Sequence, residues 1–280
     1  MLHKLKEFVP FVGNTHDLQN RKSDTGAWFL RAAVQVSPRI AQGKTSQGRY
    51  VFGADGTAYA FNNNRSVERF LAFADHGLAG FRANPPRAVA LPPPVNIQPA
   101  PPQGTSILRV YSRIRPAPAG CDPGNENLQR DHYWILPSEI ESLSNGSVPE
   151  SLALRLCRFA LVDAVRGEPD FWKPGELVRR SFRIERPASG RMRLLGSFSM
   201  ATADRRRGLE GGLEAELRII GDRLAAFRGY AEGTAWGEGT YTPGAPPGKF
   251  PIKFAFVLAP RDGATVAPQA AMYGREYLYP

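Results

Sequence analysis

The chain has 280 residues, of which 42% are hydrophobic and 22% charged, values typical of globular proteins that exclude wholesale disorder. Its 36 basic and 26 acidic side chains give a net charge of +10, carried by 29 arginines and only 7 lysines. The 28 glycines and 25 prolines make up about 19% of the chain, which favours many turns but stays below the low-complexity range.

Membrane and secretory signals are not recognisable. No run approaches the roughly 18–20 apolar residues of a membrane helix, and the apolar stretch 8–12 is too short for a signal peptide. Cys121 and Cys157 form no CxxC pair; one disulfide is an open alternative, but two reduced thiols fit a reducing compartment better. We therefore expect a cytoplasmic protein without a membrane partner.

The first elements in chain order suggest a small α/β unit. Residues 25–34 suit a helix that Asp24 can cap. Two apolar runs, 49–52 and 57–61, flank the turn Gly-Ala-Asp-Gly and predict a β-hairpin. Apolar residues at helical spacing follow from Val67 to Phe81, and Asn62-Asn63-Asn64 offer a cap. A hairpin followed by an amphipathic helix is the layout of the second half of a thioredoxin-like domain.

A proline-rich segment divides the chain. Eight prolines fall between Asn84 and Gly104, and proline fixes φ and donates no backbone hydrogen bond. We predict an extended linker at 85–104 between a unit at 1–84 and a unit at 105–280. A proline-rich ligand for an aromatic groove is the functional alternative.

Strand patterns accumulate after the linker. In residues 107–115, Leu108 and Val110 alternate with Arg109, Tyr111 and Arg113, which predicts a half-buried strand. A short helix is predicted over 139–143, beginning at Ser138. Further predicted strands are 155–162, 177–185, 191–200, 209–219, 223–232 and 250–258. The predicted fold class is α+β: a small, degenerate thioredoxin-like α/β unit followed by an antiparallel β-barrel or β-sandwich.

Short runs in both parts resemble a group of uncharacterised bacterial proteins, in which a degenerate thioredoxin-like segment precedes a β-rich domain. The runs that carry the resemblance are 8–10, 17–19, 28–29, 47–50, 55–57, 166–172 and 236–242. The resemblance implies the same two-part fold and no known activity. Residues 1–83 contain no cysteine, and dithiol exchange needs an attacking thiolate and a resolving partner, so redox catalysis by this unit is excluded.

Recognisable catalytic and metal-binding motifs are missing. The histidines, His3, His16, His76 and His132, show no ligand-type spacing, and no HExxH, Gly-x-Ser-x-Gly, P-loop or dinucleotide fingerprint occurs. Cys157 is expected inside an apolar strand, where a thiol is usually inert. We therefore predict no metal, no cofactor and no catalytic residue.

Two loops stand out as a candidate ligand site. The first, 165–174, combines opposite charges with aromatic residues, and the second, 233–248, is a long Gly/Pro-rich loop. Aromatic side chains with a few polar groups are typical of small-molecule pockets. The candidate ligand-binding residues are Arg166, Glu168, Trp172, Trp236, Glu238 and Tyr241. The structural alternative is that the two tryptophans plug barrel ends and that Arg166 pairs with Glu168.

The sequence favours a non-enzymatic module that binds a small molecule or a protein partner through these loops. The alternative is a hydrolase-like enzyme that uses Glu168 or Glu238 with Arg166. Nucleic-acid binding is the weakest of the three, because Phe182 among the arginines of 179–193 forms no clear stacking row. Charge that protects an edge strand explains those arginines equally well.

Overall fold

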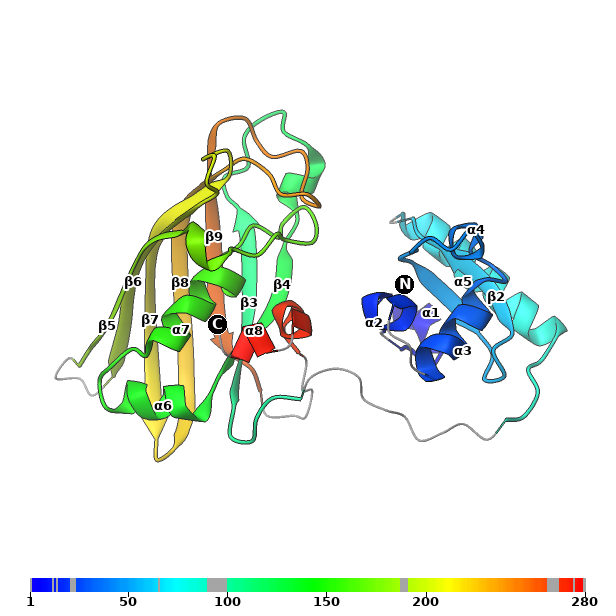
Figure 1. The fold of residues 1–280 in the computed structure, drawn as a ribbon, viewed down its shortest axis with the longest axis horizontal. Helices are drawn as coiled ribbons and strands as arrows, with labels where there is room; N and C mark the ends of the chain where they lie inside the picture. Colours follow the sequence, from blue (N-terminus) through cyan, green and yellow to red (C-terminus); the bar gives the residue numbers. More distant parts are fainter. Residues whose placement is uncertain are drawn as a thin grey trace. The chain divides into compact units, whose positions relative to one another are not determined.

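In the computed structural model, the chain forms two compact units, Met1–Ile97 and Gln98–Pro280 (Figure 1). It describes residues 2–11, 13, 15–20, 24–64, 66–89, 100–186, 191–260, 267–273 and 275–278. The division falls within the proline-rich segment 85–104, of which residues 90–99 lie outside the described residues. Among the described residues, no helix is long and apolar enough to cross a membrane.

The N-terminal unit combines five helices with one β-hairpin in the described residues. The helices are α1 (Leu2–Leu5), α2 (Thr15–Asn20), α3 (Asp24–Ala33), α4 (Pro38–Ala41) and α5 (Val67–Ala83). The strands β1 (Arg49–Phe52) and β2 (Ala58–Asn62) pair antiparallel, as the sequence predicted. The cap of α5 differs from the expectation: it is Ser66, whose side chain accepts a hydrogen bond from Arg69 N at 3.4 Å, rather than an asparagine of 62–64.

Packing of the hairpin against helices builds the core of this unit. Phe29 on α3 contacts Tyr50 and Phe52 of β1 edge-on, with ring centroids 5.3 and 5.9 Å apart. On α5, a Cβ at Gly77 would lie 2.7 Å from Val51 Cγ2 of β1. The lack of a side chain at this position therefore lets α5 approach β1 closely.

The C-terminal unit is built on one seven-stranded antiparallel sheet (Figure 1). Across the sheet the strands lie in the order β4-β3-β9-β8-β7-β6-β5, and every neighbouring pair is antiparallel. Their bounds are β3 (Ser106–Ile114), β4 (Gln129–Ile135), β5 (Leu177–Glu185), β6 (Met192–Ala201), β7 (Gly208–Ile220), β8 (Arg223–Trp236) and β9 (Lys249–Leu258). The predicted alternation in 107–115 is confirmed: Leu108, Val110 and Ile114 are buried and Arg109 is exposed.

The sheet is not closed into a barrel, which corrects the barrel prediction. Its edge strands are β4 and β5, which do not pair with each other. The C-terminal residues cover the free edge of β4: Trp134 N donates to Tyr277 Oη at 3.0 Å, and Gln269 N donates to Asp131 Oδ1 at 3.0 Å. These bonds come from the 3₁₀ helix Gln269–Tyr273 and from α8 (Arg275–Leu278). Covering an edge in this way blocks its pairing with other chains.

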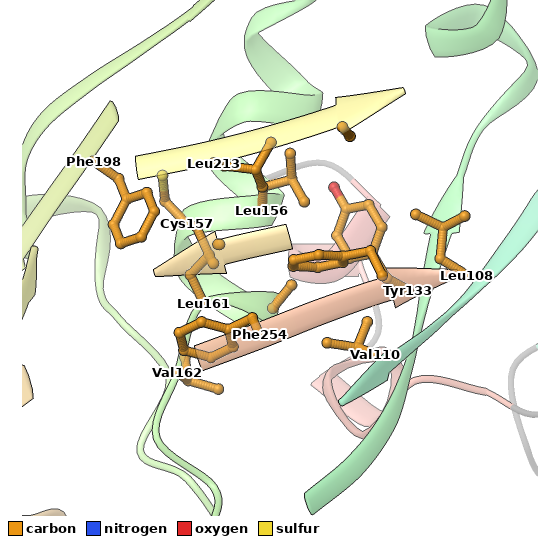
Figure 2. Close-up of a cluster of buried hydrophobic side chains, with 14 of the residues drawn as sticks. Leu108, Val110, Tyr133, Leu156, Cys157, Leu161, Val162, Phe198, Leu213 and Phe254 are labelled. Atoms are coloured by element: carbon orange, nitrogen blue, oxygen red, sulfur yellow. The ribbon is translucent and has the colours of Figure 1, made fainter. Parts of the chain in front are cut away.

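Helices form the layer that packs against this sheet, and the described residues of the C-terminal unit contain no second sheet, so the sandwich prediction was also wrong. These are α6 (Pro137–Ser144), α7 (Glu150–Arg155) and a π-helical turn, Leu156–Ala160. The segment 155–162 was expected to be a strand, but it is apolar apart from Arg155 and Arg158, and periodicity alone does not distinguish such a short run from a buried helix. Leu156 and Cys157 instead point into a core shared with Phe198, Leu213 and Phe254 of the sheet (Figure 2).

Candidate functional site

The six candidate ligand-binding residues all lie at one end of the sheet: Trp236 is the last residue of β8, and the others lie in the loops that follow the π-helical turn and β8. Arg166 is buried at this loop end, and its Nη2 pairs with Asp163 Oδ2 at 2.7 Å. Its Nε donates to the carbonyl oxygen of Thr242 at 3.2 Å, and its Nη1 donates to Asn125 Oδ1 at 3.1 Å. The guanidinium therefore ties three separate segments together, and its partner is Asp163 where the structural interpretation expected Glu168.

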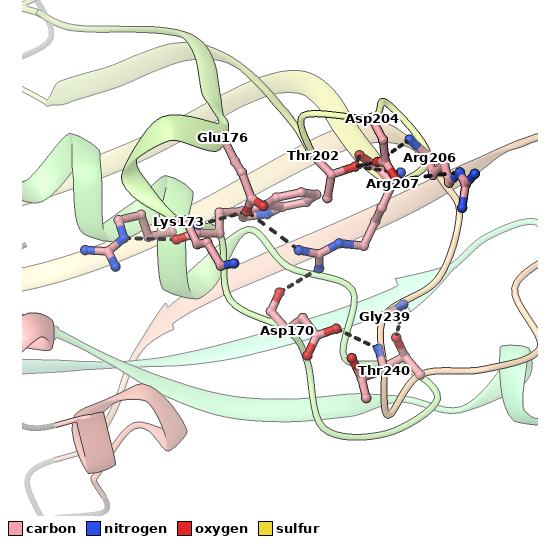
Figure 3. Close-up of polar contacts among 12 residues, drawn as sticks. Asp170, Lys173, Glu176, Thr202, Asp204, Arg206, Arg207, Gly239 and Thr240 are labelled. Carbon is pink, nitrogen blue, oxygen red and sulfur yellow. Dashed lines mark hydrogen bonds and ion pairs between the residues drawn. The ribbon is translucent and has the colours of Figure 1, made fainter.

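Trp172 is also buried, and its Nε1 donates to the carbonyl oxygen of Leu161 at 3.0 Å. Arg207, from the turn between β6 and β7, lies over its ring with the guanidinium carbon 4.0 Å from the centroid. The same arginine donates to the carbonyl oxygen of Asp170 at 2.6 Å, and it faces Glu176 (Figure 3). Burial lowers the pKa of Arg207. Arg207 was not among the ligand-binding residues predicted from the sequence.

Asp170 links the two loops at this end of the sheet. Its Oδ2 accepts a hydrogen bond from Thr240 N at 2.6 Å, which joins the loop after the π-helical turn to the loop after β8 (Figure 3). Within the latter loop, Glu238 Oε2 accepts from Gly244 N at 2.8 Å and Ala245 N at 3.3 Å. The two loops therefore form one unit, with Glu238 bound to the backbone of its own loop.

The remaining candidates lie at the surface of this loop end. Trp236 is half-buried, donates from Nε1 to the carbonyl oxygen of Arg205 at 3.0 Å, and has Lys249 Nζ 4.8 Å from its ring centroid. Glu168 is exposed, and Tyr241 is 63% exposed.

The interior of the loop end has almost no free volume. A void of about 10 Å³ lies between the two tryptophans, and Asp163, Arg207 and Thr242 also line it. This volume corresponds to about one water molecule. The arrangement brings the predicted residues together. Most of their polar atoms, however, form hydrogen bonds or ion pairs within the chain and do not face an open cavity.

A much larger depression lies at the opposite end of the sheet, where the β7–β8 hairpin turns. We call it the α6 groove; it is open on one side and has a volume of about 1090 Å³. Figure 1 shows α6 at this end of the sheet, next to the turn of the hairpin. The groove is lined by segments 103–107, 221–224 and 258–260 and by Pro137, Ser138, Ile140, Glu141 and Ser144.

The α6 groove has apolar and polar parts. Ile140 and Leu224 are buried in the core, and Ile107 and Leu258 are half-buried beside them. Exposed polar residues of its lining include Gln103, Ser138, Glu141, Asp222 and Arg223. Apolar surface with a few polar groups is the usual composition of small-molecule sites.

Buried electrostatic contacts hold the α6 wall of the groove in place. Glu139 of α6 pairs with Arg155 of α7 at 2.5 Å, and both side chains are almost fully buried. Glu139 Oε2 also accepts from Leu136 N at 2.9 Å, which caps the helix, and its Oε1 accepts from Ser151 Oγ at 3.0 Å. These contacts of Glu139 therefore hold in place the helix α6, other side chains of which line the groove.

Sequence reasoning missed the α6 groove because its lining comes from four segments that are distant along the chain. None of these segments contains a recognisable motif, and the sequence of each is typical of an ordinary turn, strand end or short helix. The only local signal was the predicted helix at 139–143, and α6 confirms that helix.

Titratable groups form no metal centre in the part of the chain that the structure describes, since no group of three His, Cys, Asp or Glu side chains gathers there. Burial raises the pKa of Asp131 to about 6, and burial together with Arg109 lowers the pKa of the neighbouring His132. Cys157 is a free thiol in the core, and burial raises its pKa to about 12; Cys121 is free and half-buried.

Comparisons with known proteins found no match: no family model, no curated protein and no solved structure is similar to this chain.

Proposed function

We propose that the C-terminal unit is a non-enzymatic binding module that takes a small amphipathic molecule into the α6 groove. The observation that carries this proposal is the contrast in volume between the two ends of the sheet, about 1090 Å³ against about 10 Å³. Ligand pockets usually measure roughly 300–1,000 Å³ and combine apolar walls with a few polar groups. An apolar part of the ligand would contact Ile140 and Leu224, and a polar part would face Glu141 and Arg223.

A second candidate keeps the loop end as the site and takes a protein partner instead of a small molecule. The supporting observation is the exposure of Tyr241, which lies beside exposed Glu168 and Glu238 in the two joined loops. A hydrolase-like use of Glu238 has less support, because its Oε2 already accepts two backbone N–H groups. For the N-terminal unit we propose a thioredoxin-like origin without redox activity, supported by the β1–β2 hairpin followed by α5.

The test of the groove is a titration of the full-length protein with the amphipathic fluorophore 1-anilinonaphthalene-8-sulfonate. We expect saturable binding of one fluorophore per chain, and native mass spectrometry of the purified protein should show any molecule carried from the cell. Ser138→Trp, which places a large ring at the groove, should weaken fluorophore binding about tenfold. Ser147→Trp, an exposed position just after α6 that does not line the groove, is the matched control.

The same titration tests which end of the sheet holds the small-molecule site. Weaker fluorophore binding in Tyr241→Ala, with unchanged binding in Ser138→Trp, would place that site at the loop end instead of the α6 groove. Absence of saturable binding to the folded wild-type protein, together with no retained molecule in the native mass spectrum, would overturn the groove proposal.

A further inference from the structure

The outward face of the C-terminal sheet, opposite the helices α6 and α7, is divided by charge. On strands β5 to β7, and at Arg191 directly before β6, arginine and glutamate neutralise one another. Arg193 pairs with Glu214 and with Glu185, the latter at 3.5 Å, and Arg191 pairs with Glu216 at 3.4 Å. This half of the face therefore presents balanced charge to solvent.

The other half carries unbalanced positive charge on β3 and β4. Arg109, Arg113 and Arg130 point outward, and Arg109 and Arg130 are exposed. No ion pair involves any of the three among the residues that the structure describes. The single acidic residue of these strands, Asp131, binds Gln269 N at the sheet edge instead.

Two tyrosines occupy one outward row in the same region. The strand register places Arg130 opposite Tyr111, Tyr111 opposite Ala255, and Ala255 opposite Tyr230. Neighbouring strands lie about 4.8 Å apart, so the two tyrosines are roughly 10 Å apart with only the small Ala255 between them. Tyr230 is 44% exposed, and Lys253 Nζ is 5.9 Å from its ring centroid.

Cationic rows flank these tyrosines on both sides. One row runs from Arg109 through Val257 to Arg228, and the other contains Arg113 next to Lys253. Lys253 is engaged with Glu232, whereas Arg228 has no ion pair among the described part of the chain. Together, Arg109, Tyr111, Arg113, Arg130, Arg228, Tyr230 and Lys253 form what we call the basic face.

We propose that the basic face binds single-stranded nucleic acid, with phosphates on the arginines and bases stacked on Tyr111 and Tyr230. Sheet-based binders of single strands combine a cationic surface with aromatic side chains on which successive bases stack. Positive charge would also attract a membrane surface or a sulfated polysaccharide, but a row of two tyrosines between cationic rows suits a single strand, whose successive bases can stack on them. This function is separate from the α6 groove, which lies at the end of the sheet near the β7–β8 turn.

The test measures fluorescence anisotropy of labelled dT20 and rU20 with the full-length protein between 50 and 300 mM NaCl. If three or four phosphates are neutralised, log affinity should fall with log salt with a slope of roughly −2 to −3. Arg109→Ala with Arg130→Ala should weaken binding at least tenfold and make the slope shallower by about 1.4. Tyr111→Ala should weaken binding about tenfold and leave the slope unchanged, because stacking carries no counterion release.

The matched control is Arg179→Ala with Arg183→Ala, which removes the same charge from exposed positions on β5 of the balanced half. It should change affinity by less than threefold. Equal weakening by both arginine pairs would overturn the assignment to the basic face. Absence of binding at 50 mM NaCl would overturn the proposal itself. Preferential binding of a heparin fragment or of phosphatidylserine vesicles, with no effect of Tyr111→Ala, would assign the face to another polyanion. Circular dichroism and the melting temperature verify that each variant is folded.

Discussion

Arg155 of α7 and Glu139 of α6 form a salt bridge from which solvent is almost completely excluded. The guanidinium lies between two aromatic rings, with its carbon 5.0 Å from the centroid of Tyr133 and 5.0 Å from that of Tyr277. It also donates to the carbonyl oxygen of Trp134 at 2.8 Å. One arginine therefore joins the helical layer, strand β4 and the C-terminal segment that covers the β4 edge.

Removal of this arginine should be severely destabilising. Arg155→Met leaves the carboxylate of Glu139 buried without its counter-charge, and loss of one partner of a buried pair typically costs about 3–5 kcal/mol. The free energy of unfolding, measured with urea, should fall by that amount.

A double-mutant cycle distinguishes the ion pair from general packing. Because the double variant with Glu139→Leu and Arg155→Met contains no buried charge at this site, it should be more stable than the two single effects predict by about 1–3 kcal/mol. Additive effects would show that the two charges do not interact.

The strands with regular alternation could be predicted from the sequence, whereas elements defined by tertiary contacts could not. Leu213, Ala215 and Leu217 alternate with glutamates on β7, and the predicted strand 209–219 lies within the observed one. On β4, by contrast, Tyr133, Trp134 and Ile135 are all buried. The C-terminal segment covers this edge, which erases the alternation that signals a half-buried strand.

The candidate site could likewise be predicted only in part from the sequence. The loops 165–174 and 233–248 were recognised by composition, and the structure joins them through Asp170 and Thr240. Composition could not show that Arg166 donates its hydrogen bonds to Asn125 and Thr242 within the protein, which leaves fewer donors for a ligand. It also could not reveal the α6 groove, because a depression is a property of segments brought together by the fold.

Asp131 should make stability depend on pH in the acidic range. Burial raises the pKa of its carboxyl group to about 6 in the folded protein, so the folded state holds this proton more tightly than the unfolded state. The resulting stabilisation is fully present below pH 4 and is lost as the pH rises through 6. Asp131→Asn retains an oxygen acceptor for Gln269 N and His132 N and removes the charge, so it should stabilise the protein at pH 7.5 by about 1–3 kcal/mol.

The measurement is urea unfolding of both proteins from pH 4 to pH 8. The gain from Asp131→Asn should appear only as the pH rises, and Asp222→Asn, at an almost fully exposed position, should show no such trend. A constant difference between Asp131→Asn and the wild type at all pH values would contradict a shifted pKa.

Cys157 should be inert to thiol reagents in the native protein. Burial raises its pKa to about 12, so only about 0.01% of it is thiolate at pH 8, and core packing also blocks access. Reaction with 5,5′-dithiobis(2-nitrobenzoate) should therefore release one fast equivalent, from Cys121, and a second only after unfolding. Cys121→Ser should abolish the fast phase and Cys157→Ser should leave it intact; the reverse assignment would place Cys157 outside the core.

Gly167 should be intolerant of even a methyl group, because a Cβ there would lie 2.1 Å from the carbonyl oxygen of Tyr241. That oxygen belongs to the backbone of the loop after β8, so the clash cannot be relieved by a side-chain rotation. Gly167→Ala should therefore separate the two joined loops and lower the free energy of unfolding by about 1–3 kcal/mol or more. The fluorescence of Trp172 should change as well, since its contact with Arg207 depends on the closed loop end.

The matched control for this variant is Gly175→Ala, in the 3₁₀ helix Pro174–Glu176, where a Cβ would have no neighbour within 4 Å. Alanine at a site without strain reduces the freedom of the unfolded chain, so the control should be neutral or more stable by up to about 1 kcal/mol. Equal destabilisation by both variants would point to a general sensitivity of residues 158–176 rather than to the contact between the two loops. Unchanged stability of Gly167→Ala would show that the loops can separate without cost, and the second candidate site would then lose its rigid support.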